Sequence, residues 1–364
     1  MDTTIIESTS LLRDQFLSLL RWGIGKESEP FQGTVYWDIV ETMAVKHGLL
    51  AVVYDAVLQL PEGQRPPQVT WLRWIGQVIQ GYEARHEAYR KAVMDLASFY
   101  NAHGYRMMLL KGDACGGDWP RPEHRPYGDI DIWLFGKQKE ADDVLVREKS
   151  IKIDNSHHHH TVFSWMGFTV ENHYDFVNVH AHKSSAELEK VFKSLGEDDS
   201  YSVEMFGEKV FLPSPNLHAL FLMKHMVSHF SAAEITLRHV LDWAFFVEKH
   251  SSEVDWEWLD GLLVKYHMKE FFNCINAICV EELGFEASIF PEIEPNPDLK
   301  ERALLDMLNP LFSSAEPNGF VPRMIYKYKR WQGNAWKHEL CYNESRWSAF
   351  LTGVWAKILK PASI

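Results

Sequence analysis

Apolar side chains recur every three to four positions over the first hundred residues, which is typical of amphipathic helices. Residues 8–103 are therefore expected to be helical, apart from a loop at the Pro/Gly-rich stretch 61–67. A long helix is predicted from about Thr70 to His103, because this stretch contains no proline. Gly104 follows at the position where glycine commonly ends a helix.

The period then changes to short apolar runs of the kind that form strands. Strands are expected at 105–110 and 129–135, on either side of a loop at 118–127 that holds three prolines. The following pattern predicts a helix and two hairpins, at 137–149, 161–179 (turn at Met166-Gly167) and 203–212 (turn around Phe206-Gly207-Glu208).

From Pro213 onward the helical period returns. Helices are expected around 217–230, 233–249, 255–268, 269–284, 298–312 and 345–359. The pattern thus predicts an α+β protein in three parts, a small mixed β-sheet core over residues 104–212 between an N-terminal helical region (1–103) and a C-terminal helical domain (213–364).

Composition and charge narrow the class of substrate. The 364 residues are 46% hydrophobic and 24% charged, which is ordinary for a globular protein, and the net charge is −13. Proteins that clamp long nucleic acid usually present a basic face, so long nucleic acid is an unlikely partner. A small molecule or a protein is the expected substrate.

The cysteines and the N-terminus suggest a compartment. The four cysteines form no CxxC pair, and Met1-Asp2-Thr3-Thr4 begins no secretory leader. No apolar run approaches the ~20 residues that span a bilayer. A cytoplasmic protein without a membrane segment is expected, and the sequence does not indicate its oligomeric state.

The most informative residues are two carboxylates in the second predicted strand. Asp129 and Asp131 lie two positions apart, so they point to one face, while Ile130 and Ile132 point to the other. Two like charges this close repel each other unless a cation lies between them. A hard divalent ion with oxygen ligands, Mg²⁺ or Mn²⁺, suits such a pair.

Three motifs in order carry a resemblance to a known family. They are Leu110-Lys111-Gly112, then Arg125-Pro126-Tyr127-Gly128-Asp129-Ile130-Asp131, then Val170-Glu171-Asn172-His173-Tyr174. This order resembles the uncharacterised nucleotidyltransferases of the polymerase-beta-like superfamily. Asn172 and Tyr174 stand where that family usually has Leu and Trp.

The resemblance implies a metal-dependent enzyme that moves an NMP group from an NTP to a hydroxyl-type acceptor on a small molecule or protein. Two Mg²⁺ or Mn²⁺ ions are expected with NTP bound. Asp129, Asp131 and Glu171 would hold them, and Glu171 would also accept the proton of the attacking hydroxyl. Lys111 is a phosphate partner, and the backbone at Gly112 would cradle the triphosphate.

One departure supports an alternative. The wider superfamily usually has Gly-Ser in the glycine turn, whereas Asp113 follows Gly112 here. A carboxylate beside phosphates is unfavourable unless it points away or meets a metal ion. The alternative is a catalytically degenerate protein that binds a nucleotide or a protein partner. A module that uses only the helical flanks for interaction is a third hypothesis.

Other polar residues admit two interpretations each. Arg125 is a candidate phosphate ligand, or it pairs with Glu123 or Asp118. His173 shares a strand face with Glu171, so it either orients that carboxylate, contacts the nucleotide or is structural.

Two further groups are expected to have ordinary roles. Arg238 and Asp242 are four residues apart and predict a helix pair. Strand alternation would split His157–His160 between two faces, so a metal site made of all four histidines is not expected.

Overall fold

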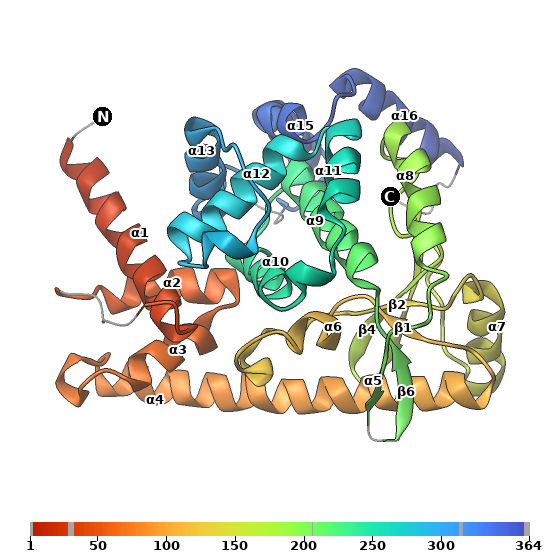
Figure 1. Cartoon of the computed structure of the whole chain (residues 1–364), viewed down its shortest axis with the longest axis horizontal. Helices are drawn as coiled ribbons and strands as arrows, with labels where there is room; N and C mark the ends of the chain where they lie inside the picture. The colour runs from red at the N-terminus through yellow and green to blue at the C-terminus, as the bar shows by residue number, and fades with distance from the viewer. Residues whose placement is uncertain (1–2, 28–32, 206, 313–315, 360–364) are drawn as a thin grey trace.

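The computed structural model describes residues 3–27, 33–205, 207–312 and 316–359. It shows an α+β protein in which helices from both ends of the chain surround one six-stranded sheet (Figure 1). The N-terminal helices are α1 (Thr3–Gly23), α2 (Trp37–His47), α3 (Leu50–Leu58), α4 (Gln68–Gln77) and α5 (Ala84–Ala102).

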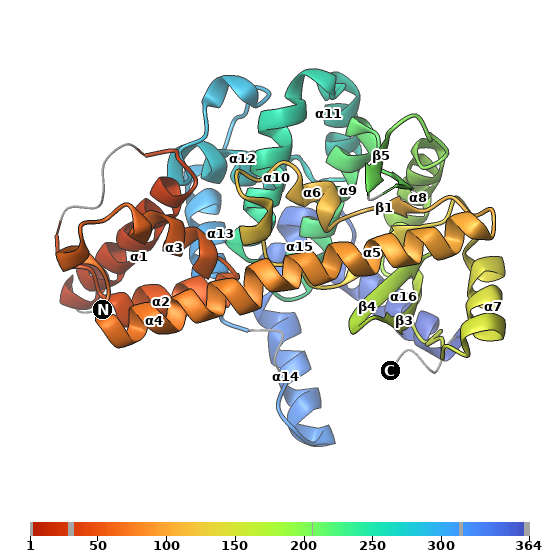
Figure 2. The ribbon, with the colours of Figure 1, turned by 90° about the horizontal axis from the view of Figure 1, so that it is seen from below.

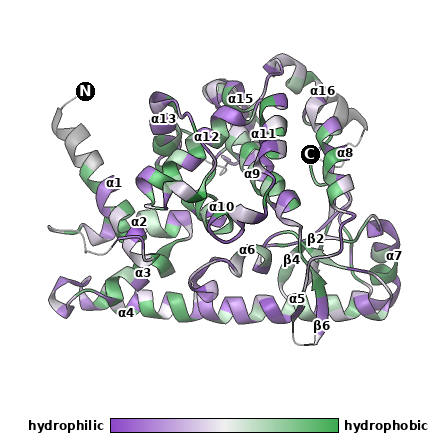
Figure 3. Ribbon diagram, viewed as in Figure 1, coloured by the Kyte–Doolittle hydropathy of each residue, from purple (hydrophilic) through white to green (hydrophobic). Residues whose placement is uncertain are grey.

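The predicted long helix is present. A π-helical stretch, Val78–Glu83, joins α4 to α5, so the helix continues from Gln68 to Ala102 along the base of the molecule (Figure 1). Gly104 follows with φ 76°, which is the left-handed backbone that glycine favours after a helix. Hydrophilic and hydrophobic residues are both present along its whole length (Figure 3).

The sheet is mixed, with strand order β3-β4-β2-β1-β6-β5. The strands β2 and β4 are parallel neighbours, as are β1 and β6, and the remaining pairs are antiparallel. The strands are β1 (Met108–Leu109), β2 (Ile130–Trp133), β3 (His160–Trp165), β4 (Phe168–His173), β5 (Ser202–Met205) and β6 (Glu208–Phe211). They confirm the sequence prediction in place, although β1 is shorter than expected and β4 ends at His173. Phe206, in the predicted second turn, lies outside the described residues.

Different helices pack against the two faces of the sheet. Ile130, Ile132 and Val170 point to one face and pack in a buried cluster with α5. Trp133 points to the opposite face, where it packs in the larger cluster that includes the C-terminal helices. Strand alternation therefore sends Asp131 and Glu171 towards the C-terminal helices rather than towards α5.

Three α-helices connect the strands, and eight more follow the last strand among the described residues. The connecting helices are α6 (Asp113–Gly116), α7 (Gln138–Lys149) and α8 (Lys183–Leu195). The C-terminal helices are α9 (Pro215–Ala232), α10 (Leu237–His250), α11 (Trp256–Lys265), α12 (Lys269–Ala277), α13 (Pro297–Leu308), α14 (Phe320–Gly333), α15 (Ala335–Cys341) and α16 (Arg346–Leu359). The helices α8, α14 and α15 were not predicted from the sequence, and Figure 2 shows α14 projecting away from the body.

The helices of the two chain ends share one core. Leu17 and Leu20 of α1 belong to the same buried cluster as Val240 and Phe245 of α10. Hydrogen bonds also cross between the two ends, for example from Arg21 Nη1 to the carbonyl oxygen of Glu282 (2.9 Å). All four cysteines are buried and unpaired, and none of the described helices has the length and apolar character needed to cross a bilayer.

Candidate active site

The second and third sequence motifs meet on adjacent strands. The β2–β4 register places Asp131 directly beside Glu171. One carboxylate oxygen of each lies within 4.8 Å of the other, and a ring nitrogen of His173 completes the group. Asp129 precedes β2 and is exposed. Partial loss of hydration, followed by the negative charge of Asp131, raises the pKa of Asp129. Asp131 and Glu171 therefore share one site with His173, and a role for Asp129 in it stays a prediction.

Asp131 is held as an anion. Its side chain is only 6% exposed, and its two oxygens meet Lys111 Nζ at 3.3 Å and His173 Nε2 at 3.4 Å. Burial alone would raise the pKa of Asp131, but the charge of Lys111 and the hydrogen bond from His173 lower it below its usual range.

The pKa of Glu171 is shifted in the opposite direction. Burial, followed by the charge of Asp131, raises its pKa to about 7. A divalent ion between the two carboxylates would relieve both effects, since it replaces lost hydration and neutralises the repulsion. The donor set of carboxylate oxygens and one imidazole nitrogen thus fits a divalent metal ion.

His173 is oriented by the backbone. Its Nδ1 lies 3.2 Å from the carbonyl oxygen of Asp175, and a carbonyl only accepts, so Nδ1 carries a proton. Nε2 therefore faces Asp131 Oδ1 and Glu171 Oε2, at 3.4 and 3.8 Å. A ring held in this way needs a cation at Nε2, either a proton or a metal ion.

The opposite wall of the site comes from α9. A cavity of ≈ 300 Å³ lies between the strand residues and this helix. Lys224, His225, Ser228 and His229 of α9 line it. His225 Nε2 lies 3.3 Å from Lys111 Nζ, and burial, followed by the charge of Lys111, lowers the pKa of His225 well below its ordinary value. A neutral His225 therefore accepts a hydrogen bond from Lys111. These residues were not predicted from the sequence, although two histidines four positions apart on one helix are a detectable signal.

Gly112 is required by packing. Its φ is 68°, and a Cβ atom built on it would lie 1.8 Å from the hydroxyl oxygen of Tyr89. The helix α6 that follows has only four residues. The backbone of the glycine turn therefore has a structural explanation, and phosphate binding at Gly112 stays a prediction.

Replacing Gly112 with Ala is expected to cost about 2–5 kcal/mol of unfolding free energy, from left-handed backbone and from overlap with Tyr89. Gly104→Ala is the matched control, because Gly104 has φ 76° but no atom within 4 Å of an added Cβ. The control is expected to lose only about 1–2 kcal/mol. Urea unfolding measures both, and equal losses would show that contact with Tyr89 does not matter.

Asp113 is turned away from the site. Its carboxylate lies 3.3 Å from Arg90 Nε and 3.6 Å from His86 Nε2, and both partners are on α5. The carboxylate therefore does not oppose phosphates at Lys111. The observation that motivated a degenerate site has a structural explanation.

Arg125 is bound inside the protein. Nε and Nη2 donate to the two oxygens of Asp242 at 2.7 and 2.9 Å, and both side chains are almost fully buried. Trp119 Nε1 donates to the same carboxylate at 2.9 Å. This bidentate pair leaves Arg125 out of our proposed phosphate contacts, and its partner is neither Glu123 nor Asp118.

The charges of Arg238 and Asp242 act on each other, as the predicted helix pair requires, but not through a direct salt bridge. Asp242 faces Arg125 instead, and no ion pair joins Arg238 to Asp242 among the described residues. The charge of Arg125, after burial, lowers the pKa of Arg238.

Asn172, which stands where the family usually has Leu, binds a carboxylate in the interior. Asn172 is fully buried on the sheet face opposite Glu171, and its Nδ2 donates to Asp142 Oδ1 at 2.8 Å. Thr161 Oγ1 donates to the other oxygen of Asp142 at 2.7 Å. The amide thus stabilises a buried carboxylate of α7, which a leucine would leave without this donor.

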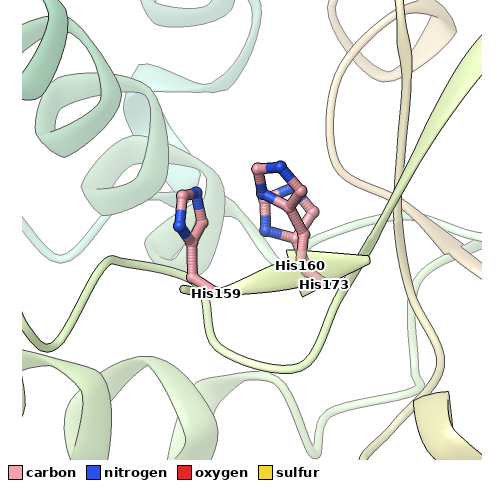
Figure 4. A group of neighbouring side chains, drawn as sticks. All are labelled: His159, His160 and His173. Carbon is pink, nitrogen blue, oxygen red and sulfur yellow. The ribbon is translucent and has the colours of Figure 1, made fainter. Parts of the chain in front are cut away.

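The histidine run does not alternate as predicted. The strand β3 begins only at His160, so strand alternation does not govern His159. His159 and His160 both point to the side of His173 (Figure 4), and a ring nitrogen of each lies within 4.8 Å of the others. Burial, followed by the charge of His173, lowers the pKa of His159 to about 2 and of His160 to about 3.

A mixed sheet that pairs two carboxylates on adjacent strands, near a Lys-Gly turn, agrees with the resemblance to nucleotidyltransferases. Residues 34–284 match a family model described as "Uncharacterised nucleotidyltransferase". The match covers more than half of the chain, so the protein belongs to this family of nucleotidyltransferases.

Other comparisons add little. No curated protein matches the chain. Among solved structures, the chain is similar to an antigenic nucleotidyltransferase-like protein from Paracoccidioides brasiliensis, with 14% identity and a TM-score of 0.32. That match covers 45% of this chain and 77% of the other.

Proposed function

We propose that the protein transfers an NMP group from an NTP to a hydroxyl-type acceptor on a small molecule or protein, with Mg²⁺ or Mn²⁺ bound by Asp129, Asp131 and Glu171. The observation that carries the proposal is the β2–β4 register, which sets Asp131 beside Glu171 at one cavity, with Lys111 Nζ 3.3 Å from Asp131. Bound divalent ions would neutralise charge on the phosphate oxygens and on the attacking hydroxyl.

The chain's own residues supply the remaining chemistry. Lys111 is a cation beside Asp131, and it would turn towards the triphosphate when a nucleotide binds. Glu171 is half-buried and lines the cavity, so it is placed to accept the proton of the acceptor hydroxyl. His173, fixed by the Asp175 carbonyl, would keep the two carboxylates in position.

A neighbouring groove offers a place for the acceptor. It has a volume of ≈ 660 Å³ and shares Lys224 and Ser228 with the first cavity. Trp331, Tyr342 and Arg346 also line it. Aromatic faces and cations suit an acceptor that carries a planar or anionic group.

The test is metal-dependent nucleotide binding and transfer. The full chain is incubated with each α-³²P-labelled NTP and Mg²⁺ or Mn²⁺, with candidate small molecules and the protein itself as acceptors. We expect calorimetry to show NTP binding that EDTA abolishes, and pyrophosphate release with at least one acceptor. NTP binding that does not need a metal ion, or no binding of any NTP with metal present, would overturn the proposal.

A further inference from the structure

Three imidazoles meet at the edge of the candidate active site. His159 directly precedes β3, His160 is the first residue of β3, and His173 is the last residue of β4. His160 and His173 are register partners, and the backbone amides of residues 174 and 175 both donate to the His159 carbonyl oxygen at 3.0 Å. The backbone thus fixes all three rings on one side of the sheet, as Figure 4 shows.

Ring nitrogens of His159 and His160 are available as ligands. His160 is only 5% exposed, and neither of its ring nitrogens has a hydrogen-bond partner among the described residues. The same holds for His159 Nδ1. A buried ring nitrogen without a partner costs free energy, and here such atoms from two residues face one cavity. A ligand that accepts lone pairs would satisfy them.

The spacing suits a four-coordinate ion. Glu171 Oε2 lies 3.7 Å from His160 Nδ1 and 3.8 Å from His173 Nε2. Two ligands of a tetrahedral ion with bonds of about 2.0–2.1 Å stand roughly 3.3 Å apart. A movement of a few tenths of an ångström would bring Glu171 to this distance from the His160 and His173 nitrogens, and the ring nitrogens of the three histidines lie within 4.8 Å of one another.

We propose that His159, His160 and His173, with Glu171 as the fourth ligand, bind one transition-metal ion such as Zn²⁺. Imidazole nitrogen favours Zn²⁺ and its neighbours in the first transition row, whereas Mg²⁺ takes oxygen ligands. The site adjoins the proposed Asp129/Asp131 ion site and shares Glu171 with it. It does not depend on nucleotidyl transfer, because its ligands and their spacing stand without a nucleotide.

The experiment uses Co²⁺ as a spectroscopic substitute for Zn²⁺. The full chain is stripped of metal with a chelator and titrated with Co²⁺ in excess Mg²⁺. We expect one equivalent to give the strong visible absorption of four-coordinate Co²⁺, and Zn²⁺ to abolish this band. Weak absorption typical of six-coordinate Co²⁺, or displacement of Co²⁺ by Mg²⁺, would overturn the proposal.

Variants assign the ligands. His159→Ala and His160→Gln are each expected to weaken Co²⁺ binding at least about 100-fold, since loss of a supporting partner already costs 10–100-fold. His159 lies outside the strand, so its variant tests the site even if His160→Gln fails to fold. The matched control is His103→Ala at the end of α5, where the ring contacts Phe99 and Glu148, and it should leave the band unchanged. An unchanged band in His159→Ala and a folded His160→Gln would also overturn the proposal.

The outcome is separable from that of the proposed function. Asp131→Asn removes an oxygen ligand of the neighbouring ion but none of the imidazoles, so it should keep the Co²⁺ band. A band without any NTP binding would leave the imidazole site standing and remove the proposed function. NTP binding and transfer without the Co²⁺ band would leave the proposed function standing and remove the imidazole site.

Discussion

Replacing Asp131 with Asn is expected to lower metal-dependent NTP turnover by at least about 10³-fold, equivalent to ~4 kcal/mol of transition-state stabilisation. The amide keeps the shape of the side chain but removes the negative charge that a divalent ion needs. Mn²⁺ affinity should fall with it. Steady-state pyrophosphate release and a Mn²⁺ titration measure the two effects.

The control for this variant is Asp143→Asn. Asp143 lies exposed on α7 and undergoes the same chemical change away from the cavity. It should keep wild-type turnover. Since Asp131 also balances the charge of Lys111, circular dichroism and thermal unfolding must show that Asp131→Asn is folded. A folded Asp131→Asn variant with normal turnover would contradict the proposed role.

Replacing Asp242 with Ala is expected to destabilise the protein by about 3–5 kcal/mol, because the change leaves Arg125 buried without its counter-charge. The same substitution removes the acceptor of the Trp119 indole N–H. The double variant Arg125→Met/Asp242→Leu should recover at least half of the loss, since it removes both charges from the interior. Urea unfolding of the single and double variants measures the difference.

An ion pair whose arginine is exposed provides the comparison. Arg121 Nη1 lies 2.6 Å from Asp55 Oδ1, but the Arg121 side chain is 44% exposed. Arg121→Met is therefore expected to cost only about 0–1 kcal/mol. If Asp242→Ala cost no more than Arg121→Met, the buried pair would have no special role in stability.

Local pattern was sufficient for much of the fold. The alternation of Ile130, Asp131 and Ile132 correctly predicted which side chains enter the core and which face the cavity. The long helix followed from periodicity and from Gly104. The pairing of Asp131 with Glu171, by contrast, came from the order of the three family motifs, since periodicity says nothing about which strands are neighbours.

The features that the sequence did not predict depend on contacts between residues distant in the chain, or on the exact residue at which a strand begins. Asp242 is 117 residues from Arg125, so no local pattern could reveal their pairing. His159 was misjudged because it lies just before β3, which begins at His160, and alternation does not apply before a strand begins. The cavity wall on α9 was missed because packing of the helix against the sheet, and not its own period, selects the face that lines the site.

The helix that runs from Gln68 to Ala102 belongs to both hydrophobic interiors. Trp74 near its start is buried with the helices of the two chain ends, while Tyr89 and Leu96 are buried against the sheet. Neither hydrophobic core can unfold without exposing one end of this helix. Heat or denaturant should consequently melt the sheet and the helical body as a single cooperative unit, and a fragment cut at residue 104 would take the sheet away from the surface on which it is built.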